Sequence, residues 1–354
     1  MNYFTRLKYR LKHLFSKKIY RQHNIDSHQK IVLIAGHDLK FIEEIIEKLR
    51  DDNYRVLIDS WQGHNNHKAR KSERLLNQAD IIICEWCLGN AVWYSKNKLV
   101  HQQLIVRFHR QEIETDYPAI MDIHAVDKMI FVSNTFLQKA REKFSWKIND
   151  KFIVIGNYTI SQDNDLQKVN NSKFNLGIVG IVPKMKRLDR ALDILEEIRK
   201  KDKRFQLFIK GKTAKDFPWM KDRPDDTKYF KEQNERIASS KYLQGAVHFD
   251  GYDKDMPKWY QKIGFVLSVS DFESFHLTIA DGASTGAITI IIKWEGSNEI
   301  YPESWSLENI DEAAKKILRL SRNKNSYTEE AKKCKAYVQK YSLDTIYNEW
   351  IELL

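Results

Sequence analysis

The feature of this sequence that most restricts its fold is a regular alternation of short apolar runs with longer amphipathic segments. Runs such as KIVLIAG and DIIICEW have the length and the β-branched content of buried strands, and helical periodicity marks the segments between them. Strands that alternate with helices in this way form a parallel sheet with helices on its faces. The sequence therefore predicts an α/β fold.

The alternation occurs twice, with a polar interruption near the middle of the chain. It runs from about Lys30 to Asn157, stops over the polar stretch 157–173, and restarts at the run FNLGIVGIV. A chain of 354 residues has room for two such domains. We therefore predict two doubly wound, Rossmann-like domains that face each other across a cleft, because ligands of such domains bind at the carboxyl ends of the strands.

Four segments are expected along the chain. They are a basic amphipathic segment (1–28), a first Rossmann-like domain (29–160), a second one (161–324) and C-terminal helices that pack back on the first domain (325–354). Within residues 1–21, Lys and Arg alternate with Phe, Leu and Ile at helical spacing, and no acid is present. This pattern is typical of a helix that lies on an anionic membrane surface, and equally of a helix packed against the protein.

Charge and cysteine content limit the class of partner and the compartment. The net charge of +11 favours an anionic membrane, nucleic acid or a negatively charged substrate. Nucleic acid is not expected, because no recognition motif is present and the basic residues are dispersed outside residues 1–21. Three cysteines form no disulfide framework, and Cys84 and Cys87 are interpreted as two buried thiols at a strand end. With no signal peptide or apolar span apparent, we expect a cytoplasmic protein, with the inner face of the membrane as an open alternative.

Three motifs of the second half follow one another at characteristic spacing. The first is GIVGIVPKMKRLDRAL, the second is VHFDGYDKDMPKWYQ, and the third is SDFESFHLTIADGASTGAITIII. Together they resemble the donor-binding domain of GT-B glycosyltransferases, most closely the large retaining family numbered four. The resemblance covers the chain from about Lys30 onward in architecture and is sharp between Leu176 and Ile292. It implies a GT-B fold and a nucleotide-sugar donor.

The resemblance assigns the first motif to the diphosphate of the donor. Gly180 lies in the loop that meets the donor, and Lys186 and Arg187 supply cations beside the leaving phosphate. A fixed cation stabilises the negative charge that develops there. Ile181 stands where the family has a second phosphate-binding arginine, which is a departure from the pattern.

The resemblance assigns the third motif to the sugar, the ribose and the phosphates. Glu273 matches the family's first glutamate and would bind hydroxyls of the donor sugar. Asp281, eight residues later, replaces the second glutamate and would bind the ribose. Backbone N–H groups at the start of the intervening helix would receive phosphates. His276 stands where a glycine is usual, and could crowd or contact the sugar. The donor-binding residues implied here are Ser274, Phe275, His276, Leu277, Thr278 and Asp281.

Further positions complete the implied site. Gly251 and Tyr252 would form the pocket for the base, Lys210 would reach phosphate, and Gly36 would lie in the first loop over the donor. His109, at the carboxyl end of the run LIVRFH, would face the donor sugar from the first domain. The residues implied in catalysis are His109, Lys186, Arg187 and Glu273. The DKD triplet (253–255) is interpreted as a helix cap, and neither a metal nor another cofactor is expected.

The resemblance implies a retaining transfer, most commonly from a UDP-sugar, to a glycan or lipid-linked acceptor in bacterial cell-surface polysaccharide synthesis. No covalent nucleophile stands out in the sequence, which suits front-face attack with the leaving phosphate as base. Three alternatives stay open at this point. They are a basic protein that binds membrane or nucleic acid, an epimerase on the same fold, and a non-catalytic relative.

Overall fold

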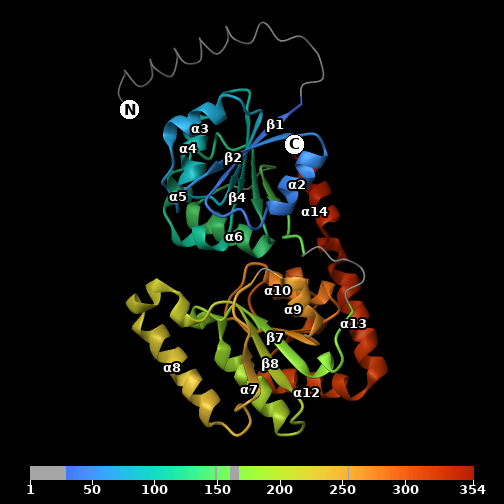
Figure 1. The fold of residues 1–354 in the computed structure, drawn as a ribbon. Helices are drawn as coiled ribbons and strands as arrows, with labels where there is room; N and C mark the ends of the chain where they lie inside the picture. The colour runs from blue at the N-terminus through green and yellow to red at the C-terminus, as the bar shows by residue number, and fades with distance from the viewer. Residues whose placement is uncertain (1–28, 148–149, 160–166, 254) are drawn as a thin grey trace.

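A computed structural model describes residues 29–147, 150–159, 167–253 and 255–354. The basic segment 1–28 and its two interpretations lie outside these residues. The described chain forms two α/β domains, one above the other in Figure 1, and the C-terminal helices connect them on one side.

The first domain contains a parallel sheet whose strand order is β2-β1-β3-β4-β5-β6. Its strands are β1 (Ile31–Gly36), β2 (Arg55–Ser60), β3 (Ile81–Glu85), β4 (Gln103–Arg107), β5 (Lys128–Phe131) and β6 (Phe152–Val154). Its helices are α2 (Glu43–Asp51), α3 (Ala69–Leu76), α4 (Gly89–Asn97), α5 (Tyr117–Ile120) and α6 (Asn134–Phe144), with the 3-10 turn η1 (Arg110–Glu114).

The second domain contains a parallel sheet of order β12-β11-β10-β7-β8-β9. Its strands are β7 (Asn175–Val179), β8 (Gln206–Lys210), β9 (Val247–Phe249), β10 (Phe265–Ser268), β11 (Ile288–Ile292) and β12 (Ser306–Leu307). Its helices are α7 (Leu188–Arg199), α8 (Pro224–Ser239), α9 (Met256–Gln261), α10 (Leu277–Ser284), α11 (Ser297–Ile300) and α12 (Ile310–Arg322), and α13 (Lys324–Val338) and α14 (Leu343–Ile351) end the chain. The remaining 3-10 turns are η2 (Ser172–Phe174), η3 (Lys184–Lys186), η4 (Ala214–Asp216), η5 (Pro218–Asp222), η6 (Glu303–Trp305) and η7 (Gln339–Tyr341).

The strand orders locate the ligand crevices. In the second domain the order is that of the dinucleotide-binding fold, 3-2-1-4-5-6, so the chain reverses direction across the sheet between β7 and β10. In the first domain the reversal lies between β1 and β3. Ligands of such sheets bind outside the carboxyl ends of the strands at these points. The predicted fold of two Rossmann-like domains is confirmed.

The last helix of the chain completes the core of the first domain. Alternate side chains of β1 point to opposite faces, so that Leu33 packs with α4 and α6 while Ile34 packs with α2 and α14. Trp350 of α14 is 1% exposed and packs in the apolar cluster that contains Ile34 and the buried side chains of α2. The hydroxyl of Tyr347, also in α14, donates to Asp52 at 2.6 Å. Figure 1 shows α14 beside α2.

Trp350→Ala should therefore destabilise the first domain, although the residue lies at the end of the chain. Removing a fully buried tryptophan leaves a cavity and costs about 3–5 kcal/mol of unfolding free energy. Trp219→Ala is the matched control, because that indole is 38% exposed. Urea unfolding of both variants checks the difference, and equal losses would mean that α14 contributes little to the core.

The two domains also contact each other directly on one side. Glu299 of the second domain accepts hydrogen bonds from the backbone of Asn134 and Thr135, at the N-terminus of α6 in the first. A carboxylate at that position is stabilised by the helix dipole and by unpaired N–H groups.

Among the described residues, no helix has both the length and the apolar character needed to cross a membrane.

Candidate active site

A cleft of about 800 Å³ separates the two domains. Residues of both domains line it: Asp38, Lys40, Phe41, Glu43, Glu44, Asn157 and Tyr158 of the first, and Val179, Lys210, Gly211, Tyr252, Asp253, Met256, Pro257 and Leu277 of the second. Three of the predicted donor-site residues, Lys210, Tyr252 and Leu277, are therefore in its wall. Lys186, Glu273, His276 and His109 lie outside that lining.

An ion pair joins the first and third motifs of the second domain. Glu273 lies in the loop between β10 and α10, is 9% exposed, and its Oε1 lies 2.6 Å from Lys186 Nζ. Lys186 ends the 3-10 turn η3, which follows β7. Because β7 and β10 are the neighbouring strands at the reversal of the sheet, the fold brings two residues 87 positions apart to the predicted ligand crevice.

The surroundings of Glu273 keep its carboxyl group ionised. Burial alone would raise the pKa of Glu273, but the electrostatic effects of His276 and Lys186, with hydrogen bonds from Lys186 and Ser270, lower the pKa to about 2. Burial lowers the pKa of His276 to about 4. The His276 ring is therefore neutral at pH 7, and Lys186 is then the charged partner of Glu273.

This shift predicts an acid-sensitive contribution to stability. Since the folded-state pKa of Glu273 is lowered, its contribution is fully present above about pH 4.5 and is lost as the pH falls toward 2. At pH 7, Glu273→Gln should cost roughly 2–3 kcal/mol of unfolding free energy, and the difference from wild type should narrow by about half by pH 3. Urea unfolding at several pH values checks this. A difference in unfolding free energy between wild type and Glu273→Gln that does not change with pH would contradict this prediction.

His276 occupies a backbone conformation that explains the glycine expected there. It precedes α10 with φ 52° and ψ 66°, in the left-handed region that glycine adopts at little cost. A non-glycine residue in this region is uncommon and is often found at functional sites. Two hydrogen bonds hold it: its Nδ1 lies 2.5 Å from Ser268 Oγ, and its carbonyl oxygen accepts from the Tyr301 hydroxyl at 3.1 Å.

Two predicted glycines lie in equivalent loops. Gly180 follows β7 and Gly251 follows β9, and both have positive φ angles, 72° and 65°. Side chains other than glycine rarely adopt this conformation, so glycine permits the chain to turn sharply where these strands end.

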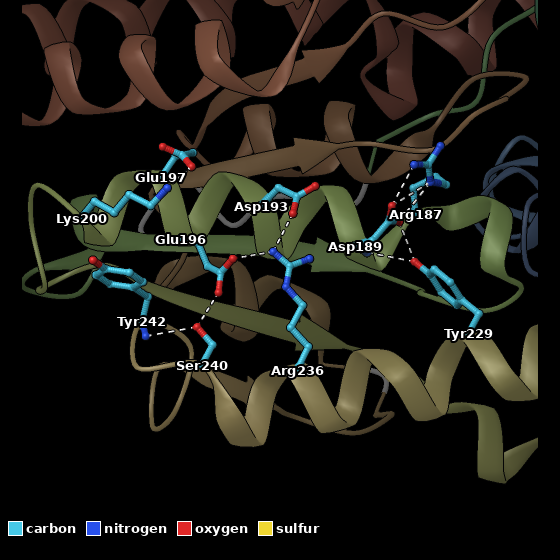
Figure 2. Close-up of polar contacts among 10 residues, drawn as sticks. All are labelled: Arg187, Asp189, Asp193, Glu196, Glu197, Lys200, Tyr229, Arg236, Ser240 and Tyr242. Atoms are coloured by element: carbon cyan, nitrogen blue, oxygen red, sulfur yellow. Dashed lines mark hydrogen bonds and ion pairs between the residues drawn. The ribbon is translucent and has the colours of Figure 1, made fainter.

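The two cations of the first motif have different partners. Arg187 is held by two carboxylates: its Nη2 lies 2.8 Å from Asp189 Oδ2 and its Nη1 2.7 Å from Asp271 Oδ1. In Figure 2 the Arg187 side chain meets Asp189, which also accepts a hydrogen bond from Tyr229 of α8. Further along the same pair of helices, Arg236 bridges two acids of α7 (Figure 2). Arg187 thus belongs to a network that connects the start of α7 with α8 and with the loop after β10, whereas Lys186 is paired with Glu273.

Several predicted residues are buried in the second domain. Ile181, where the family has an arginine, is 2% exposed in the apolar core. Phe275 is also in that core and packs edge-on against Tyr341. Thr278 and Asp281 are buried on α10, at 9% and 6% exposure, and Ser274 is half-buried.

Lys210 and Tyr252 line the part of the cleft that faces β8 and β9. The Lys210 side chain is 4% exposed, and its ammonium group pairs with Asp253. The Tyr252 ring is 66% exposed, and the Lys212 ammonium group lies 5.7 Å from its centroid. Asp255 caps α9 by accepting from the Lys258 backbone N–H, so the predicted helix cap is confirmed for this residue of the DKD triplet.

In the first domain, His109 is enclosed by rings and by a buried carboxylate. Its Nε2 lies 2.8 Å from Glu85 Oε1. The centroid of its ring lies 4.0 Å from that of the Trp86 ring and 5.2 Å from that of the Phe41 ring. Arg107 Nη1 also donates to Glu85 Oε1, at 3.1 Å. Burial would raise the pKa of Glu85, but Arg107 and His109 lower it. Glu85 and Trp86 are residues that the sequence prediction missed.

One signal could have identified Glu85. An acidic residue that ends a fully apolar strand is unusual, and β3 is one of the two strands at the reversal of the sheet. Glu85 lies between Cys84 and Cys87, which are free, buried thiols, as predicted. Gly36 is also at this point, where a side chain would meet the Glu85 carbonyl oxygen at 2.9 Å.

Asp38 lies in the loop before the first helix of this domain. The helix α2 begins at Glu43, and the Asp38 carboxylate accepts a hydrogen bond from the Lys40 backbone N–H. In the part of the chain that the structure describes, no group of three or more His, Cys, Asp or Glu side chains could hold a metal ion.

The second domain matches a family model. Residues 173–323 match the model described as Glycosyl transferases group 1. No curated protein matches the chain.

Solved structures match over both domains. One is the Anabaena Alr3699/HepE structure in complex with UDP-glucose, with a TM-score of 0.68, 14% identity, and coverage of 92% of this chain and 99% of the other. A glycosyltransferase from Rickettsia africae has the same TM-score and identity, over 92% and 98% of the two chains. A mutant of S. aureus TarM, in complex with Fondaparinux, alpha-GlcNAc-glycerol and UDP, has a TM-score of 0.59 and 18% identity. That match covers 77% of this chain and 55% of TarM, so this chain spans about half the length of TarM.

Proposed function

We propose that this chain, which has the GT-B fold and belongs through its second domain to the group 1 glycosyltransferases, transfers a sugar from a nucleotide-sugar donor with retention of configuration. The observation that carries the proposal is the Lys186–Glu273 pair, at the carboxyl ends of β7 and β10. It combines a cation for a leaving phosphate with a carboxylate for sugar hydroxyls, at the point where a Rossmann-like sheet binds its ligand.

Each part of the donor has a chemically suitable partner nearby. The leaving diphosphate would meet Lys186 and the backbone N–H groups at the start of α10, and Lys210 offers a second cation in the cleft wall. The base would stack on the exposed Tyr252 ring. Asp281 would accept the ribose hydroxyls. Two carboxylates, Asp189 and Asp271, hold Arg187 away from this role, whereas the partner of Lys186 is Glu273, which belongs to the proposed site itself, so Lys186 is the principal cation of this proposal.

The configuration of the anomeric carbon would be retained if the acceptor attacked this carbon from the same face that the phosphate leaves. The bond from the acceptor oxygen to the anomeric carbon forms as the bond from that carbon to phosphate breaks, and the acceptor proton passes to the departing phosphate oxygen. This route needs no protein nucleophile. His109, fixed by Glu85 beside Trp86, would bound the sugar from the first domain.

We propose UDP as the nucleotide, because UDP or UDP-glucose is bound in the Anabaena and S. aureus structures named above. The acceptor would be a glycan or a lipid-linked glycan of the bacterial cell surface. A net charge of +11 suits work on anionic acceptors at the inner face of the membrane, with residues 1–21 as the contact. No metal or other cofactor is required, since Lys186 would supply the positive charge.

A thermal-shift panel tests the proposal. UDP, GDP, ADP and their sugar conjugates are compared on wild type and Glu273→Ala, because a ligand that binds only the folded state raises Tm. We expect a shift from the uridine compounds, with the additional shift from the sugar lost in Glu273→Ala. No shift from any nucleotide would refute the donor site and favour a basic surface-binding protein. Nucleotide-sugar binding without nucleotide release, even with acceptor, would favour an epimerase or a non-catalytic relative.

A further inference from the structure

His276 ends a chain of hydrogen bonds that begins in the core. The Trp294 indole N–H donates to Ser268 Oγ at 3.1 Å, and Ser268 Oγ lies 2.5 Å from His276 Nδ1. All three side chains are buried. Beyond the ring, His276 Nε2 lies 3.8 Å from Glu273 Oε1, which is too long for a hydrogen bond.

The chemistry of these groups fixes which nitrogen of His276 carries the hydrogen. An indole can only donate, so Ser268 Oγ accepts from Trp294. Among the described residues, His276 Nδ1 is the one acceptor within hydrogen-bond distance of this hydroxyl, so the Ser268 hydrogen is given to His276 Nδ1. Burial lowers the pKa of His276 to about 4, so the ring is neutral at pH 7. A neutral ring that accepts at Nδ1 carries its hydrogen on Nε2. An N–H donor is therefore directed to the side of Glu273.

An N–H donor and an ionised carboxylate 3.8 Å apart form a pair that one hydroxyl group satisfies. A hydroxyl can accept from the N–H and donate to the carboxylate at the same time. An oxygen at about 2.8 Å from both atoms meets them at an angle near 85°, which an approaching hydroxyl can adopt. A hydrogen or an ether at the same carbon satisfies at most one of the two groups.

We infer that His276 Nε2–H and Glu273 Oε1 together recognise a single hydroxyl of the donor sugar, with Ser268 and Trp294 as the residues that position the ring. The inference rests on the proposed function and makes His276 a specificity-determining residue. A sugar with a free hydroxyl at the recognised carbon is accepted, and the deoxy or O-substituted sugar is disfavoured.

The test compares the nucleotide with its sugar conjugate by isothermal titration calorimetry. UDP and UDP-glucose are titrated into wild type, His276→Gly and Ser268→Ala, with GDP-mannose and UDP-N-acetylglucosamine as further donors. Glycine suits the left-handed conformation at 276, so that variant should fold. Ser284→Ala is the matched control for Ser268, because the Ser284 hydroxyl donates to the backbone of its own helix.

We expect the Kd of UDP to stay within about twofold in both variants, while the advantage of the best sugar conjugate over its nucleotide falls about tenfold in His276→Gly. An advantage that His276→Gly leaves unchanged would overturn the inference. If wild type binds no nucleotide at all, the proposed function fails, and the inference fails with it. Nitrogen-15 NMR of the histidine side chains tests the protonation of the His276 ring separately. The inference requires His276 in the Nε2–H form and a change of that signal in Ser268→Ala, and an Nδ1–H form would refute it.

Discussion

Glu273→Gln should lower the rate of nucleotide release from the donor by about 100–1,000-fold, while UDP alone still binds. The substitution keeps the shape of the side chain, but it removes the charge that pairs with Lys186 at 2.6 Å and replaces one of the two acceptor oxygens that would orient the sugar by an NH2 donor. Steady-state release of nucleotide gives kcat, and calorimetry with UDP gives the Kd. The effect should appear mainly in kcat, because sugar and leaving group would be misplaced in the transition state.

Glu308→Gln is the control for this substitution. Glu308 also pairs with a lysine, at 2.9 Å from Lys293 Nζ, but the pair is exposed. An exposed pair contributes little, and we expect kcat within about twofold of wild type. Equal activity of Glu273→Gln and Glu308→Gln would contradict the role of the carboxylate.

Lys186→Met and Arg187→Met should separate two adjacent cations. Lys186→Met removes the charge that would stabilise the leaving phosphate, so kcat should fall by about 100-fold or more. Arg187→Met breaks the pairs with Asp189 and Asp271, so it should lower Tm, with a much smaller loss of kcat. Both rates are measured with the same donor, and Tm is recorded for both variants.

A larger loss of kcat in Arg187→Met than in Lys186→Met would contradict this assignment. It would mean that Arg187 leaves its carboxylates and reaches the phosphates when the donor binds. The double variant adds a check, because loss of both cations with turnover intact would refute electrostatic stabilisation of the leaving group altogether.

The fold was predictable because it follows from periodicity. Buried parallel strands are almost continuously apolar, as IIIC of β3 shows, and each is followed by an amphipathic helix. Periodicity does not specify which strands pair, so the strand order could not be obtained from the apolar pattern alone. It was implied by the resemblance of the three motifs to a known fold.

The residues of the site were predictable only as far as motifs extend. The spacing identified Glu273 and Lys186 as candidates. The pairing of Arg187 with Asp271, 84 positions away, could be seen only in the structure. The unusual His276 was visible in the sequence, whereas its left-handed backbone and its contact with Ser268 required the structure. Glu85 belongs to no motif, and its contact with His109 depends on the pairing of β3 with β4.

The most direct test of the central proposal is proton NMR of the donor during turnover. The nucleotide sugar selected by the thermal-shift panel is incubated with wild type, and the anomeric signals are followed before mutarotation. We predict release of the nucleotide together with a product of the donor's own anomeric configuration, both lost in Glu273→Gln. First appearance of the opposite anomer would contradict the retaining mechanism, and unchanged release in Glu273→Gln would contradict the assigned site.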